Sequence, residues 1–452
     1  MTEERKKEYL IYKIADTMKG HTKMDPDLFT KLDVKRGLRN EDGTGVLVGL
    51  TNIGNVVGYE RKDGEIIPCE GKLFFRGYEV SDIVSAIMAE KRFGFEEVAY
   101  LLLSGELPDA EALAEFSSLI YDNMYLEKNT LLHIIEMEGH DIMNILSRSV
   151  LEMYTFDENP DDLSKENLMR QSIELISKFP TIIAYAFNML RRKEFGRSLH
   201  IRDAKRELSI AENFLYMLKG PDKYSELDAR TLDLLMILHS EHGGGNNSTF
   251  TVRVTSSAGT DTYSSIAAGI GSLKGPKHGG ANIKVSDMIA WIKSRIIDWK
   301  DEVELKKVLQ SILAKEGFDK SGLIYGIGHA VYTKSDPRTV LLKKMAAKLA
   351  AEKGRVAEYE LLERIERLAI EAFKEAKGQD KIICANVDFY SGFVYDLIGI
   401  PREIYTPLFA MARIVGWCAH RNEELNFEGR RIIRPAYRCI TDENKYKKLS
   451  RR

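Results

Sequence analysis

Apolar residues recur at helical spacing along most of this chain. In the window SDIVSAIMAEK, residues 81–91, Ser81 is the expected N-cap of a helix. One face of that predicted helix carries Ile83, Val84, Ile87 and Met88. The pattern indicates an amphipathic helix packed on a core.

Several later windows repeat this pattern and also contain helix boundary signals. The run 208–218 is followed by a Gly-Pro pair at 220–221, which is typical of a helix end. An Asp-Pro pair at 336–337 opens a predicted helix that ends at Gly354, and residues 361–373 form another. The chain is therefore predicted to be mainly helical.

Strand patterns are confined to one early region. Residues 46–60 and 65–78 are rich in β-branched and aromatic residues, and they flank Asp63-Gly64, a strong hairpin signal. We expect a small β hairpin region near the N-terminus of a mainly α protein. Neither a fixed-period repeat nor a Pro-rich linker is present, so composition does not locate a domain boundary.

Composition excludes several classes of protein. Charged residues make up 30% and apolar residues 44% of the 452 residues, which is typical of a globular chain and not of disorder. The net charge of −2 predicts no affinity for nucleic acid or an anionic membrane. Any anionic ligand has to be bound by local groups.

The ends and the cysteines of the chain indicate its compartment. Charges interrupt the N-terminal sequence MTEERKKEYLIYKIADTMKG, so it lacks the apolar core of a signal peptide, and no stretch of about 18 uncharged apolar residues follows. The four cysteines are scattered without a C-x-x-C pair, at Cys69, Cys384, Cys418 and Cys439. We expect a cytoplasmic protein in a reducing environment.

The first cluster of polar chemistry ends an apolar helix. In LDLLMILHSEHGGGNNSTF, His239 and His242 follow the apolar run and precede three glycines. One interpretation is a buried helix that carries histidines into a site. The other is a helix C-terminus whose histidines satisfy the last carbonyls, with glycine as the cap.

Two segments resemble known motifs without meeting their requirements. The HGGG at 242–245 resembles an esterase oxyanion strand, but the chain has no G-x-S-x-G nucleophile motif. The glycines at 269–275 are spaced one residue too widely for a dinucleotide-binding loop, and no predicted strand precedes them. The sequence therefore favours neither a serine hydrolase nor a Rossmann domain.

Two more histidines and one aspartate stand in unusual settings. His278 lies in GPKHGGAN and His329 in YGIGHAVYTKSDPR, where glycines let the backbone approach a ligand closely. Asp388 in NVDFYSG lies between apolar residues just before a predicted helix. A structural turn or, for Asp388, helix N-capping would also explain these residues.

Three arginines complete the pattern: Arg338 at a helix start, Arg413 in the apolar run FAMARIVGWCAH, and Arg434 in GRRIIRP. A single arginine in such a run usually extends to solvent or pairs with a carboxylate. Together with the histidines, however, guanidinium groups are the natural partners of a di- or tricarboxylate. A metal site built from the histidines stays open, although the possible ligands are widely spaced.

These motifs, in this order, resemble the citrate synthase family. The resemblance runs from FFRGYEV at residue 74 through HSEHGGGNNST, GPKHGGAN, GHAVYTKSDPR, NVDFYSG and ARIVGWCAHRNEE to IIRP. It covers roughly the last five-sixths of the chain. It implies a large helical domain, residues 1–281 and 391–452 with an N-terminal arm at 1–70, and a small helical domain at 282–390.

The resemblance also implies roles for three catalytic residues. His278 would hydrogen-bond the thioester oxygen of acetyl-CoA, and Asp388 would remove the methyl proton. His329 would polarise and then protonate the oxaloacetate carbonyl. The two domains would close over both substrates, usually within a homodimer, and neither a metal nor a further cofactor is expected.

Further positions match the substrate contacts of the family. The oxaloacetate carboxylates would be held by His242, Arg338, Arg413 and, from the neighbouring subunit, Arg434. The coenzyme A contacts would come from Leu323, Gly326, Gly328 and Asn386.

The expected reaction is the condensation of acetyl-CoA with oxaloacetate and water to citrate and CoA. The alternative is a 2-methylcitrate synthase that uses propionyl-CoA with the same residues. One methylene changes the binding free energy by only about 1–3 kcal/mol, so the sequence leaves the acyl group open. A metal-dependent hydrolase, by contrast, would hold a stoichiometric metal.

Overall fold

The computed structural model describes residues 2–451 except 64, 137–138 and 379–381. The chain divides into two compact units, Met1–Leu50 and Thr51–Arg452. The first unit contains helices α1 (Glu3–His21) and α2 (Asp27–Lys31) and the short 3-10 helix η1 (Arg36–Leu38). The second unit contains every segment singled out above for its chemistry.

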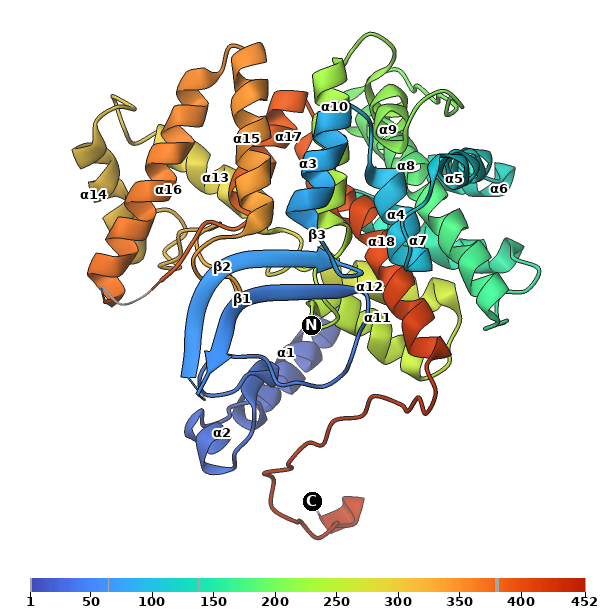
Figure 1. Cartoon of the computed structure of the whole chain (residues 1–452). Helices are drawn as coiled ribbons and strands as arrows, with labels where there is room; N and C mark the ends of the chain where they lie inside the picture. Colours follow the sequence, from blue (N-terminus) through green and yellow to red (C-terminus); the bar gives the residue numbers. More distant parts are fainter. Residues whose placement is uncertain (1, 64, 137–138, 379–381, 452) are drawn as a thin grey trace. The chain divides into compact units, whose positions relative to one another are not determined.

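The second unit is mainly helical, as the sequence predicts, with a small antiparallel sheet (Figure 1). Its strands are β1 (Gly54–Lys62), β2 (Glu65–Phe75) and β3 (Tyr78–Glu79). Its helices are α3 (Val80–Glu90), α4 (Phe95–Ser104), α5 (Ala110–Asp122), α6 (Lys128–Glu136), α7 (Ile142–Phe156), α8 (Lys165–Phe195), α9 (Ile210–Lys219), α10 (Glu226–Ser240), α11 (Asn247–Ser257), α12 (Thr262–Lys274), α13 (Ala281–Lys293), α14 (Glu302–Leu313), α15 (Pro337–Glu352), α16 (Val356–Lys377), α17 (Asp388–Ile398), η2 (Arg402–Ile404), α18 (Tyr405–Asn426) and η3 (Leu449–Arg451).

The predicted hairpin is present, but its first strand is shorter than expected. β1 pairs antiparallel with β2 from Gly54 to Lys62, with a register shift between Val57 and Tyr59, and Gly64 of the predicted turn lies outside the described residues. β1 begins only at Gly54, and the backbone N–H of Val46, in the predicted strand, bonds to the carbonyl of Leu38. β3 continues the sheet beside β2, which the sequence pattern did not predict.

The start of α3 also differs from the prediction. Ser81 is not its N-cap, because β3 leads directly into the helix, which begins at Val80 with Glu79 at the cap position. Ile83, Val84 and Ile87 are buried as predicted, whereas Met88 is 36% exposed. The predicted core face of this helix was therefore one residue too wide.

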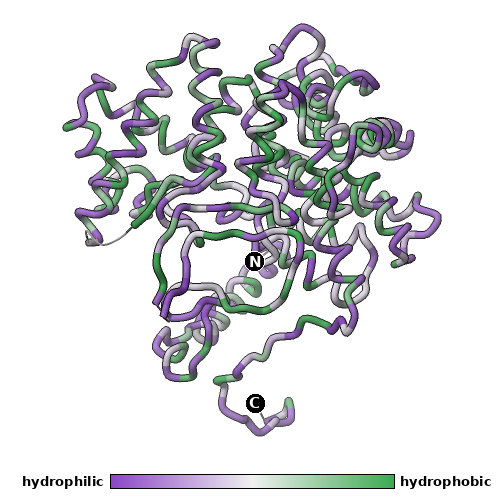
Figure 2. Tube along the Cα trace, viewed as in Figure 1, coloured by the Kyte–Doolittle hydropathy of each residue, from purple (hydrophilic) through white to green (hydrophobic). Residues whose placement is uncertain are grey.

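Helices α10 and α18 pass through the interior of the second unit and pack against each other (Figure 1). Nearly every residue of α18 from Tyr405 to Arg421 is buried, which is typical of a helix covered on all sides. Other helices, such as α16, are amphipathic, and Figure 2 shows hydrophobic and hydrophilic residues alternating along them. The two central helices carry polar residues into the core.

Helices α13 to α17 pack mainly on one another, α14 on α16 and α17 on both α13 and α15. Helix α10 contacts α15 and α17, so it lies beside this second helical group. The division at residues 282–390 stays a prediction. Among the described residues, no helix is both long and apolar enough to cross a membrane, and the four cysteines are free thiols.

Candidate functional site

Three segments far apart in the sequence meet where α10 ends. The imidazole ring of His242, just after α10, lies 5.1 Å from that of His329, edge to face. The Nε2 atom of His329 lies 3.5 Å from Nη2 of Arg338 at the start of α15. The structure thus brings together two glycine-flanked histidines and one of the three arginines singled out in the sequence.

The hydrogen bonds of His329 determine which ring nitrogen carries the proton. Its Nδ1 accepts the backbone N–H groups of Val331 and Tyr332, each at 3.0 Å. A nitrogen that accepts is unprotonated, so the proton of the neutral ring is on Nε2. His329 therefore has an N–H that faces the arginine side of the site.

Arg338 is buried together with a carboxylate. Its Nε and Nη2 bond to the two oxygens of Asp336 at 3.0 and 2.7 Å, and only 4% of Arg338 is exposed. Asp336 also caps α15 by accepting the backbone N–H of Arg338. The pair fixes the guanidinium in place and leaves Nη1 outside the pair.

Arg413 of α18 is fully buried, and no carboxylate of the described residues forms a hydrogen bond with it. Its Nε donates to the carbonyl oxygen of His239 at 2.6 Å, while Nη1 and Nη2 have no partner among the described residues. Burial lowers the pKa of Arg413 to about 10, so the group is still charged at neutral pH. A buried fork with two unused donors fits a carboxylate.

His278 lies beside the same arginine. Its Nε2 accepts the backbone N–H of Ser248 at 3.3 Å and lies 3.0 Å from the Ser248 hydroxyl, which accepts from Trp417. Burial, with a smaller effect of Arg413, lowers the pKa of His278 to about 4. The neutral ring therefore carries its proton on Nδ1, where it can donate to a ligand.

Asp388 is the first residue of α17. The N-cap of this helix is Val387, and no side-chain cap bond is present, so N-capping does not explain Asp388. Burial raises the pKa of its carboxyl to about 6, with Asp336 adding to the shift and Arg338 and Arg413 opposing it. At neutral pH the carboxylate is ionised but is a stronger base than an exposed aspartate.

The four expected coenzyme A positions differ in their exposure. Asn386 donates its side-chain amide to the carbonyl of Gly328 at 2.8 Å, and its backbone N–H bonds to Gly326. Both glycines have positive φ, +82° and +99°, which favours glycine. Leu323 is 57% exposed, so this loop has an open end and an end fixed to the site.

Arg434 does not reach the other residues in a single chain. It is exposed in the segment that follows α18, and it forms no hydrogen bond or ion pair with the described residues. His239, by contrast, donates from Nδ1 to the Leu235 carbonyl of its own helix at 2.8 Å, which fits the structural interpretation. Its Nε2 is nevertheless buried without a partner.

The sequence did not point to several groups that complete the site. The ring of Tyr332 lies 4.6 Å from that of His329, and the ring of Phe409 lies 4.6 Å from that of His239 and 4.8 Å below the guanidinium of Arg413. Phe409 stands in an apolar run, and Tyr332 follows Ala330 and Val331, and in both settings an aromatic residue is an ordinary core residue. Spacing alone gives no signal for such roles.

The site contains an unusual number of buried polar atoms without partners in the described chain. They are Nε2 of His239, Nε2 of His242, the hydroxyl of Tyr332, and Nη1 and Nη2 of Arg413. Each such atom costs about 1–3 kcal/mol of stability when it is left unpaired. The free nitrogens of Arg413 and the hydroxyl of Tyr332 are donors, so they can bind a small anion. Nε2 of His239 is instead an acceptor, because Nδ1 of the same ring donates to Leu235.

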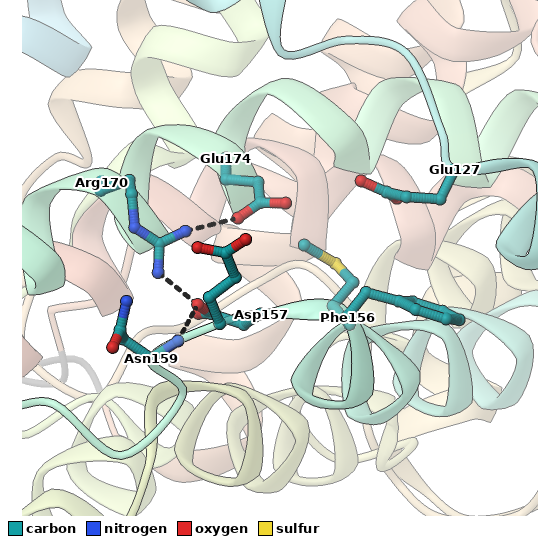
Figure 3. A pocket seen from close by; sticks show the side chains of 8 residues that line it. Glu127, Phe156, Asp157, Asn159, Arg170 and Glu174 are labelled. Atoms are coloured by element: carbon teal, nitrogen blue, oxygen red, sulfur yellow. Dashed lines mark hydrogen bonds and ion pairs between the residues drawn. The ribbon is translucent and has the colours of Figure 1, made fainter.

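A separate pocket of about 270 Å³ contains none of these residues (Figure 3). Its polar groups bond to one another, as Arg170 does to Asp157 and to Glu174. Asp157 in addition accepts from Gln171 and Tyr263, and its pKa falls to about 2 despite burial. This pocket is a polar junction between helices. No group of three or more metal-binding side chains occurs in the described ranges.

The chain is similar to known proteins over most of its length. A family model described as citrate synthase, C-terminal domain, matches residues 42–436. A citrate synthase from Deinococcus radiodurans is 36% identical over 342 residues, 75% of this chain and 84% of that relative. A 2-methylcitrate synthase from Shewanella oneidensis is 33% identical over 366 residues, 80% and 87% of the two chains.

One solved structure adds ligands to this similarity. Citrate synthase from Thermoplasma acidophilum, in a ternary complex with carboxymethyl coenzyme A and oxaloacetate, is 26% identical, with a TM-score of 0.73. The match covers 92% of this chain and 99% of that one. The similarity thus extends over nearly the whole fold.

Proposed function

This chain belongs to the citrate synthase family, an acyltransferase family, and we propose that it condenses acetyl-CoA with oxaloacetate and water to citrate and CoA. The observation that carries the proposal is the buried guanidinium of Arg413, whose Nη1 and Nη2 have no partner in the described chain. Arg413 lies in one site with the neutral histidines His242 and His278 and with the basic carboxylate of Asp388. The ternary complex of the Thermoplasma acidophilum relative contains a dicarboxylate and a coenzyme A analogue, which supports the same pair of ligands.

The first chemical step is the removal of a proton from the acetyl methyl group. Asp388, with a pKa raised to about 6, is the base for this step. The Nδ1–H of His278 donates to the thioester oxygen, where negative charge develops. Since His278 is neutral and fixed by Ser248, it stabilises the enol or enolate without first losing a proton to solvent.

The second step joins the enol carbon to the oxaloacetate carbonyl carbon. The Nε2–H of His329 polarises the carbonyl and transfers its proton to the developing alkoxide. Arg413, Arg338 and His242 hold the carboxylates of oxaloacetate. Water then hydrolyses the citryl-CoA thioester, which releases CoA and citrate.

The remaining assignments belong to the same proposal. The loop with Leu323, Gly326 and Gly328, together with Asn386, binds coenzyme A. A small domain at residues 282–390 closes on the large domain, so that the dry site strengthens the hydrogen bonds to the transition state. Arg434 reaches the site of the neighbouring subunit in a homodimer, which agrees with its exposure in a single chain.

The alternative is 2-methylcitrate synthesis from propionyl-CoA. The Shewanella oneidensis relative with that name is 33% identical, so the similarity of the sequences does not separate the two reactions. Both use the same residues, and the pocket has only one methylene to distinguish.

The deciding experiment measures thiol release from purified protein with oxaloacetate and either acetyl-CoA or propionyl-CoA. A higher kcat/KM with acetyl-CoA supports citrate synthesis, and a higher value with propionyl-CoA supports the alternative. The absence of thiol release from both would refute the assignment of this site. Asp388→Ala is the matched control, because it should abolish turnover while oxaloacetate still binds.

A further inference from the structure

A group of buried ionisable residues, Glu241, His420 and Arg253, lies next to the loop of His242 and to helix α18 of Arg413. Glu241 and His420 are fully buried, and 7% of Arg253 is exposed. None of them has a part in the proposed chemistry. Buried ionisable groups are costly unless they are paired, so a second role is expected for this group.

The hydrogen bonds between Arg253, His420 and Glu241 have a defined direction. Nε and Nη2 of Arg253 donate to Nδ1 of His420 at 3.0 and 2.8 Å. The remaining proton of His420 is therefore on Nε2, which donates to Oε1 of Glu241 at 2.9 Å. The same oxygen accepts the backbone N–H of Gly243. His420 thus holds the Glu241 carboxylate, which in turn joins the residues on both sides of His242.

Arg253 is fixed in turn by two carboxylates. Its Nη1 bonds to Glu424 at 2.7 Å and its Nη2 to Glu423. The ring of His420 therefore cannot turn without breaking bonds at both nitrogens. Although burial opposes its ionisation, the contact with His420 keeps the pKa of Glu241 below the ordinary value, so this carboxylate is charged.

One face of α18 follows the end of α10 residue by residue. Arg413 donates to the carbonyl of His239, Gly416 lies against Ser240 and Glu241, and His420 bonds to Glu241. Positions i, i+3 and i+7 share a face of a helix. A Cβ on Gly416 would lie 2.5 Å from Oε2 of Glu241, so glycine is required for this close approach.

We propose that His420 and Glu241 form a positioning pair, which holds the loop after α10 against α18 and thereby sets His242 and Arg413 at the spacing that oxaloacetate requires. The inference rests on the proposed function for the identity of this ligand. His420 and Glu241 act through their neighbours and do not touch the substrate. Loss of the pair should weaken oxaloacetate binding and leave the later chemistry largely intact.

Two substitutions of His420 separate its two hydrogen bonds. The amide of His420→Gln can replace Nε2 and keep the bond to Glu241, whereas that of His420→Asn replaces Nδ1 and leaves Glu241 without its donor. We expect His420→Asn to raise the KM for oxaloacetate and its Kd by calorimetry at least tenfold. The kcat should fall less than threefold, and His420→Gln should stay within threefold of the wild type in all three constants.

Hydrogen exchange provides a readout that does not depend on turnover. The Gly243 amide should exchange faster in His420→Asn than in the wild type or in His420→Gln, since its acceptor, Glu241, is released. Equal exchange and equal oxaloacetate binding in the two variants would overturn the positioning role. Failure of the proposed function would be recognised separately, because the wild type itself would then release no thiol, while the exchange experiment would still decide on the loop.

A glycine variant tests the same contact without a change of charge. Gly416→Ala should raise the KM for oxaloacetate, because the new methyl group displaces Glu241 and the carbonyl of Ser240. Gly271→Ala is the matched control, since a Cβ on this helical glycine meets no atom within 4 Å. Arg421→Lys is a second control, because Arg421 is buried next to His420 but, within the described part of the chain, donates to Thr260 and to hydroxyls on α11 and α12 and not to Glu241. An unchanged KM in Gly416→Ala would contradict the proposal.

Discussion

Replacing the proposed catalytic base should make the protein more stable. Burial raises the pKa of Asp388 from 3.8 to about 6 in the folded chain, so the folded state pays for ionising this carboxyl. A shift of about 2 pKa units corresponds to roughly 3 kcal/mol. Asp388→Asn removes this cost with almost no change of shape, and we expect the free energy of unfolding at pH 7.5 to rise by up to about 3 kcal/mol.

The size of this effect depends on pH in a defined way, while its sign stays the same. Because the pKa of Asp388 is higher in the folded state, the unfolded chain loses its proton first as pH rises. The destabilisation is absent below the unfolded pKa of 3.8, grows through the window to about 6, and is complete above it. At pH 5 the same relation leaves a difference of only about 1.6 kcal/mol between the variant and the wild type.

The assay is thermal unfolding without ligands at pH 5 and pH 7.5. With an unfolding entropy of about 2.1 cal/mol/K per residue, 452 residues give a Tm increase of about 3 °C at pH 7.5 and about half of that at pH 5. Asp396→Asn on the same helix is the control. Its carboxylate is 58% exposed and pairs with Arg355, so its loss should lower stability by less than about 1 kcal/mol. A variant Asp388→Asn that is no more stable than the wild type, or whose gain is the same at both pH values, would refute the reasoning.

Three further outcomes are expected. The kcat/KM of the wild type should fall tenfold per pH unit below about 6 as Asp388 is protonated, and an inflection near 4 would instead indicate His278. Arg413→Ala should raise the KM for oxaloacetate at least 30-fold, in line with about 2–5 kcal/mol for a buried charged pair, and unchanged saturation kinetics would contradict its role. Gly71→Ala should lower kcat/KM, because its Cβ would overlap the carbonyl of Ser335 in the loop that leads to α15; kinetics equal to the wild type would show that the hairpin does not support this loop.

Local patterns in the sequence predicted the elements of the fold better than their boundaries. The helix at 337–352 has its start set by Asp336 and the proline after it, and both signals act within a few residues. The start of α3 was wrong because its position depends on the pairing of β3 with β2, which no local pattern records. The exposure of Met88 likewise depends on which neighbours α3 meets.

In the candidate site, too, local features could be predicted from the sequence and contacts between distant segments could not. Glycine next to histidine at His278 and His329 is a local signal, and both residues lie in the site. The bond between His420 and Glu241 spans 179 positions along the chain, and nothing near either residue predicts it. Arg434 was assigned to a neighbouring subunit, which a single chain does not contain, so its role stays a prediction.

The burial of the site also determines which of its residues are charged and which are neutral. Desolvation favours the neutral form of every group, and it lowers the pKa of His239 to about 3, that of His278 to about 4 and that of His242 far below its ordinary value. Among the basic groups of the site, a group with the high intrinsic pKa of arginine keeps its charge under such conditions, and Arg413 does so even with its pKa lowered to about 10. The arginines therefore supply the charge that attracts a dianion, while the histidines act as neutral hydrogen-bonding groups. The burial that keeps these histidines neutral also raises the pKa of Asp388, which makes its carboxylate a stronger base for removing a proton from carbon. Binding and chemistry therefore depend on one physical cause, desolvation.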